Sequence, residues 1–152
     1  MKTIVALVDL SDLTFKVLKQ AHALATALHR EVIILHVLSK VPVVVDVGLI
    51  SPVVMQDPSP EVVHQQTEQL FEMRDSLIKF GVKASVEQLA DPSVAGVLAE
   101  TRRRNADLII LGSHHHSTFY HLLVGNVAAD VLKGAHCPVL VVPSDEDVPE
   151  KK

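Results

Sequence analysis

Short runs of β-branched and aliphatic residues alternate with longer amphipathic segments along most of the chain, and this alternation constrains the fold more than any other feature. The apolar runs cover residues 3–8, 32–38, 82–89, 107–112 and 138–142. Strands that alternate with helices run parallel, because each right-handed crossover helix brings the chain back across one face of the sheet. The pattern therefore predicts an α/β fold, with an open five-stranded parallel sheet and helices on both faces.

The segments between these runs have apolar residues at helical spacing. Residues 12–29 form the first predicted helix. A second opens at Ser59 and Pro60, runs to about Phe80 and stops at Gly81. Asp91 is predicted to cap a third, which starts at Pro92 and Ser93 and ends near Asn105. The fourth covers residues 120–133 and ends at Gly134.

Length and composition indicate one soluble domain. The chain has 152 residues, of which 48% are hydrophobic and 21% charged. We assign residues 1–143 to the domain and predict that the acidic tail, residues 144–152, is disordered. A net charge of −4 argues against general nucleic-acid binding, and no apolar run approaches the ~20 residues of a membrane span. Cys137 is the only cysteine, which excludes an internal disulfide and favours the cytoplasm.

Residues 40–60 interrupt the alternation. Four prolines and a glycine within this segment, with Pro60 at its end, disfavour a long helix or a central strand, yet the segment is rich in valine. Two interpretations stay open. From Lys40 to Pro60 the chain folds over a pocket or packs on a partner, or it patches the domain's own core.

Ligands of such sheets bind beyond the carboxyl ends of the strands, where the strand order reverses. Asp9 and Ser11 directly follow the first strand. These two residues suit the cap of the following helix. A carboxylate at Asp9 could also accept a hydrogen bond from a ribose hydroxyl or an exocyclic amine. The residues alone do not favour either role over the other.

Residues 112–118 form the most unusual segment, Gly-Ser-His-His-His-Ser-Thr. A glycine at a strand end, followed by small polar residues, can present N–H groups to an anion. The consecutive histidines His114, His115 and His116 have no supporting cysteine or glutamate at ligand spacing, so we expect no metal site. The Walker loop, the dinucleotide glycine motif and the Gly-x-Ser-x-Gly elbow are all absent.

Several segments, taken in order, resemble the universal stress protein family from Lys2 to Val142. The run from Thr3 to Ser11 is similar to the family's Val-Asp-Gly-Ser strand end, and residues 35–37 match its Leu-His-Val. The segments 106–114, 122–127 and 136–143 look like its last two strands and the turn between them. The family's signature is Gly, two residues, Gly, nine residues, then Gly-Ser or Gly-Thr. Gly112 and Gly125 match its first and third glycines, whereas His115 and Asn126 depart from it.

The resemblance implies a three-layer Rossmann-like fold, of the adenine nucleotide alpha hydrolase type, with strand order 3-2-1-4-5. It implies ATP or AMP binding between the first and fourth strands, although the bulk of His115 weakens the fit to phosphate. It also implies a homodimer joined through the fifth strand, from Pro138 to Val142. The implied nucleotide site consists of Leu7, Asp9, Ser11, Val37, Leu111, Gly112, His114, His115, Gly125, Asn126 and Val127.

Three hypotheses follow from these observations. The first is a non-enzymatic stress-response regulator that binds an adenine nucleotide. The second is a dimer without nucleotide that recognises an unidentified protein through residues 40–60. The third is weak ATP hydrolysis or autophosphorylation, for which the histidines are the only candidate bases.

Overall fold

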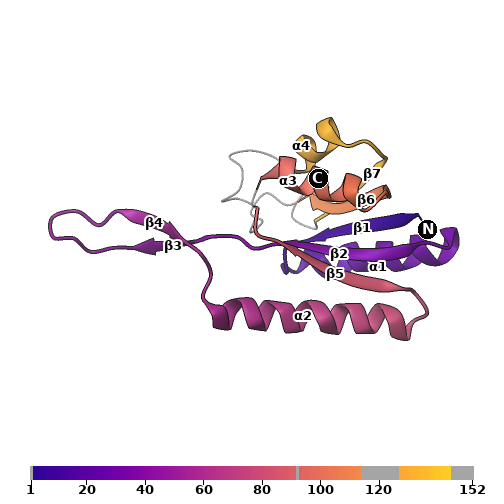
Figure 1. The fold of residues 1–152 in the computed structure, drawn as a ribbon, viewed down its shortest axis with the longest axis horizontal. Helices are drawn as coiled ribbons and strands as arrows, with labels where there is room; N and C mark the ends of the chain where they lie inside the picture. Colours follow the sequence, from indigo (N-terminus) through magenta and orange to yellow (C-terminus); the bar gives the residue numbers. More distant parts are fainter. Residues whose placement is uncertain (1, 92, 114–126, 145–152) are drawn as a thin grey trace, which may run out of the picture.

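The computed structural model describes residues 2–91, 93–113 and 127–144 (Figure 1). The remaining residues, which include 120–126 of the predicted fourth helix and most of the acidic tail, lie outside this description. The elements occur in the order β1 (Thr3–Val8), α1 (Leu13–Leu28), β2 (Glu31–Val37), β3 (Val41–Val44), β4 (Val53–Gln56), α2 (Pro60–Lys79), β5 (Ala84–Leu89), α3 (Val94–Arg103), β6 (Ala106–Ser113), α4 (Val127–Gly134) and β7 (Val139–Pro143).

Five of the strands form one parallel sheet, in the order β5-β2-β1-β6-β7. Counted along this sheet alone, that is the order 3-2-1-4-5. The fold expectation is therefore confirmed. β1 lies at the centre, where Val5 is paired with Ile33 of β2 on one side and Ile109 of β6 on the other. All six residues of β1 are buried.

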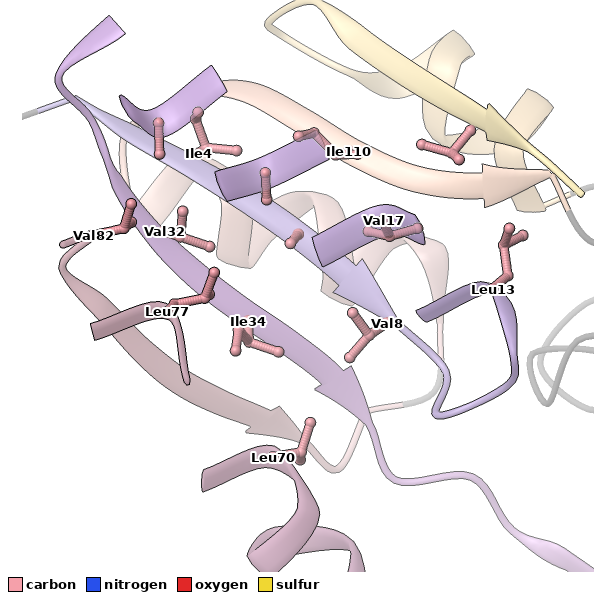
Figure 2. Packing of buried hydrophobic residues seen from close by; sticks show 14 residues of the cluster. Ile4, Val8, Leu13, Val17, Val32, Ile34, Leu70, Leu77, Val82 and Ile110 are labelled. Atoms are coloured by element: carbon pink, nitrogen blue, oxygen red, sulfur yellow. The ribbon is translucent and has the colours of Figure 1, made fainter. Parts of the chain in front are cut away.

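Helices cover both faces of this sheet. Alternate β1 residues Ile4, Ala6 and Val8 face α1 and α2 in one apolar cluster, which Figure 2 shows from close by. Val5 and Leu7 belong to the opposite cluster, with residues of α3 and α4. The period of two along the strand thus assigns successive side chains to different cores.

The helix ends are mostly formed by the predicted residues. Ser59 caps α2, its hydroxyl accepting a hydrogen bond from the Val62 amide at 3.3 Å. The cap predicted for α3 is wrong. Ser93, not Asp91, occupies that position and accepts from the Gly96 amide at 3.0 Å, while Asp91 accepts from the Ser93 amide. Asp91 lies two residues before the cap position of α3.

Residues 41–56, here called the arm, form a separate two-stranded sheet of β3 and β4. The strands are antiparallel, with Val43 opposite Val54. Gly48 at the tip has a φ of 97°, which glycine adopts readily in a tight hairpin turn. The arm extends away from the main sheet (Figure 1), and its apolar residues are mostly exposed. The interpretation that this segment patches the domain's own core is therefore wrong.

Candidate functional site

The carboxyl ends of β1 and β6 lie side by side and open into one small cavity. Ala6 of β1 is paired with Ile110 of β6, so the residues beyond each pair converge. Five residues that the sequence assigns to the site line this cavity, namely Leu7, Asp9, Leu111, Gly112 and Val127. The enclosed volume is about 20 Å³, room for about one water molecule. The geometry therefore places the two predicted halves of the site together.

Asp9 is held rigidly at this cavity by the start of α1. Its Oδ1 atom accepts hydrogen bonds from the Ser11 amide at 3.0 Å, the Ser11 hydroxyl at 2.5 Å and the Thr14 hydroxyl at 3.4 Å. Ser11 Oγ in turn accepts from the Leu13 amide at 3.3 Å. The predicted cap by Asp9 and Ser11 is wrong, because Asp12 occupies the N-cap position of α1 and makes no side-chain cap hydrogen bond. Because the Asp9 carboxylate lines the cavity, its position suits a role toward a ligand.

Leu10 lies between these two residues and has a φ of 62°. A left-handed conformation costs a non-glycine residue roughly 1–2 kcal/mol. The family pattern that this segment resembles has glycine at the same place. The turn geometry is thus retained here despite the leucine.

Gly112 makes a close packing contact that the sequence did not reveal. A Cβ atom added there would lie 2.2 Å from Cδ2 of Leu13, the first residue of α1. The missing side chain therefore lets the start of α1 pack directly against the end of β6. Sequence reasoning assigned this glycine to phosphate approach alone.

The other predicted site residues lie elsewhere or outside the described part. Val37 is buried at the end of β2 among residues that pack on α3 and α4, and it is not among the residues lining the cavity. His114, His115, Gly125 and Asn126 lie outside the described residues. The cavity also has lining residues that we did not predict, namely Val8, Leu13, Thr14, Val17 and Ala128. Two features of the sequence could have identified some of them. Leu13 and Val17 have the apolar spacing of a helix face, and Thr14 places a hydroxyl three residues after Ser11.

His36 is a buried polar residue close to this site. It is 3% exposed and is paired in register with Val8, the neighbour of Asp9. Its Nδ1 atom lies 3.5 Å from Nε2 of Gln88, whose Oε1 accepts a hydrogen bond from the Thr67 hydroxyl at 3.0 Å. Burial lowers the pKa of His36 from 6.5 to about 4, and the nearby Asp9 charge opposes that shift. The imidazole is therefore neutral at physiological pH.

Cys137 and the arginines at the end of α3 have structural explanations. Burial, with the Asp107 charge as a smaller cause, raises the pKa of the Cys137 thiol, so it stays protonated among apolar neighbours. Arg103 and Arg104 both pair with Glu100 at the end of α3. Within the described ranges, no three His, Cys, Asp or Glu side chains are placed to hold a metal, and no helix there is long and apolar enough to cross a membrane.

A doubly wound sheet with a cavity where the strand order reverses defines a class, the open α/β domains that bind ligands beyond the carboxyl ends of their strands. Comparisons with known proteins narrow this class. A profile of the Universal stress protein family matches residues 1–143. A universal stress protein of Methanocaldococcus jannaschii is 30% identical over 141 residues, which cover 93% of this chain and 81% of that protein. The chain belongs to the universal stress protein family.

Solved structures share the fold. A universal stress protein of Archaeoglobus fulgidus, in complex with dAMP, matches with a TM-score of 0.64 and 21% identity, over 93% of this chain and 97% of that one. A family member of Arabidopsis thaliana, with AMP bound, matches with a TM-score of 0.60 and 17% identity, over 99% and 98% of the two chains. At these identities the likeness concerns the arrangement of elements. Adenine nucleotides are thus bound by related folds.

Proposed function

We propose that this protein is a stress-response regulator that binds AMP or ATP at the crevice between β1 and β6. The observation that carries the proposal is the shared cavity, in which Asp9 and Gly112 lie together with Leu7, Leu111 and Val127. The complexes of related folds with AMP and dAMP support it.

The chemistry of the lining suits an adenosine. Leu7, Leu111 and Val127 offer apolar contact to a planar base, and the oriented Asp9 carboxylate can accept from an exocyclic amine or a ribose hydroxyl. The enclosed volume is about 20 Å³, whereas small-molecule sites measure roughly 300–1,000 Å³. The nucleotide would therefore lie on the open side of this cavity. The family signature assigns the phosphates to His114, His115, Gly125 and Asn126, which lie outside the described residues.

The protein would act by binding and not by catalysis, as a cytoplasmic homodimer. β7 is the last strand of its sheet, with β6 on one side only, and Val141 on it is exposed. Pairing of this strand with its equivalent in a second copy would cover the sheet edge. Val141→Lys should then lower the mass measured by light scattering, and an unchanged mass would contradict this dimer.

Calorimetric titration with AMP, ATP and GMP tests nucleotide binding. We expect saturable binding of the adenine nucleotides and at least tenfold weaker binding by Asp9→Asn, because hydrogen bonds to a charged group contribute about 1.5–3 kcal/mol. The asparagine keeps an acceptor oxygen for Ser11 and Thr14, so the turn should survive. Asp107→Asn, near the opposite end of β6, is the matched control and should bind normally. No binding at millimolar AMP or ATP would refute the proposal.

Phosphate release from ATP tests the absence of catalysis. Release should proceed at the same background rate in the wild type and in Asp9→Asn. A rate that falls in the variant would show hydrolysis at this crevice instead.

A further inference from the structure

The arm exposes apolar side chains on both of its faces, which is unusual for a segment with no core of its own. On one face the register brings Pro42 against Met55 and Val44 against Val53. On the other, Val43 lies against Val54. A two-stranded hairpin alone is at best marginally stable in water. The apolar residues of the arm are therefore not covered by the described part of the chain.

The exposed area is too large for an ordinary monomer surface. Eight large apolar residues of the arm are exposed, namely Val41, Val44, Val47, Leu49, Ile50, Val53, Val54 and Met55. Together they present on the order of 800 Å², spread over both strands, both faces and the tip, whereas one side of a standard protein interface measures about 800 Å². The largest apolar patch of a typical monomer is roughly 300–600 Å². The arm thus has the size and character of an interface.

The two edges of the arm differ in their hydrogen-bonding groups. Toward the tip, the Val45 amide donates to the Pro52 carbonyl at 3.0 Å and the Val47 amide to the Ile50 carbonyl at 3.3 Å. Inward and outward groups alternate along antiparallel strands. It follows that Pro42 and Val44 face outward on β3, and Val53 and Met55 face outward on β4. Pro42 has no N–H, so β3 presents an incomplete edge, whereas β4 presents a complete one.

We infer that β4 pairs with β4 of a second copy of this chain, antiparallel and with the two-fold axis at Val54. Val53 and Met55 flank that axis symmetrically and both face outward. Each therefore meets the other in the partner subunit as a hydrogen-bonded pair, and the two copies of Val54 face each other. Such a contact is self-complementary, as a two-fold interface has to be. The arm is clear of the main sheet (Figure 1), so its length is available for this contact.

This interface is separate from the β7 edge and does not rest on nucleotide binding. The arm leaves the sheet after β2, whereas β7 forms one outer edge of the sheet. A chain that uses both contacts assembles into a closed tetramer where the two axes intersect at right angles, and one that uses the arm alone forms dimers. In both of these assemblies loss of the arm contact halves the mass.

Disulfide trapping tests the register. In a Cys137→Ser background, Val54→Cys should form a linked dimer on mild oxidation, because the two copies face each other across the axis. Val44→Cys is the control on the outer strand. Val44 is 65% exposed and Val54 43%, so random collisions would favour linkage at Val44. Equal linkage at the two positions, or none at Val54, would overturn the proposal.

A second pair of variants tests the edge without new thiols. Met55→Pro and Val44→Pro each remove one outward N–H from the arm, the first from β4 and the second from β3. We expect light scattering to show half the wild-type mass for Met55→Pro and the wild-type mass for Val44→Pro. Identical masses for all three proteins would mean that the arm faces a different protein, and the proposal would fall.

Discussion

β1 and the arm have similar composition and opposite surroundings. β1 reads Thr-Ile-Val-Ala-Leu-Val and every residue is buried, whereas β4 reads Val-Val-Met-Gln and every residue is exposed. Both are short, apolar and extended. The comparison teaches that an apolar strand has to be covered, while its own residues do not say whether the cover comes from the same chain or from another.

Position in the sheet accounts for the difference. β1 has β2 and β6 as neighbours and a helical layer on each face. The arm leaves after β2 and returns directly into α2, and in the folded protein α1 and α2 pack on one face of the main sheet and α3 and α4 on the other. In the described part of the chain the arm therefore packs on neither face.

Acid should have the largest effect of these changes on the stability of the main sheet, because the sheet buries His36 as a neutral imidazole. Its pKa is about 4 in the folded protein and 6.5 in a solvated chain, so unfolding takes up a proton between these values. The free energy of unfolding should therefore fall by about 3 kcal/mol as the pH drops from 6.5 to 4. Urea titrations at several pH values measure this loss.

The matched comparison uses two glutamine variants. His36→Gln should flatten the acid dependence, whereas His64→Gln, an exposed position on α2, should leave it unchanged. Parallel pH profiles for the wild type and His36→Gln would contradict the prediction.

Removing two methyl groups from the centre of the sheet should have the next largest effect. Val5 is 1% exposed between β2 and β6. Val5→Ala should lower the free energy of unfolding by about 2 kcal/mol, because burial of each CH₂ contributes about 0.8 kcal/mol and a cavity adds to the loss. The midpoint of urea denaturation at pH 7 measures it, and a loss below 0.5 kcal/mol would show that the sheet repacks freely.

The same substitution in the arm should have the smallest effect. Val44 is on the outer strand and exposed, so Val44→Ala should change the free energy of unfolding by no more than about 0.5 kcal/mol. Denaturation at low protein concentration keeps association out of the measurement. Equal losses from Val5→Ala and Val44→Ala would erase the distinction between the two regions.

Only part of the site could be predicted from the local sequence. Asp9 and Gly112 were identified because each directly follows an apolar strand, and their convergence followed from the parallel sheet. The contact of Leu13 with Gly112 could not be predicted, because it depends on the angle at which α1 crosses β6. The burial of His36 against Gln88 likewise depends on the pairing of β2 with β5.

Sequence alone determined which segments form the strands of the main sheet and that these strands run parallel, because these properties follow from residue periodicity and the handedness of short connections. It did not reveal the hairpin of β3 and β4. Only the tertiary structure decided that one valine-rich strand lies at the centre of a core while another stands in solvent. That outcome depends on how much sheet surface is left uncovered when the chain has folded, which is a property of all the elements together.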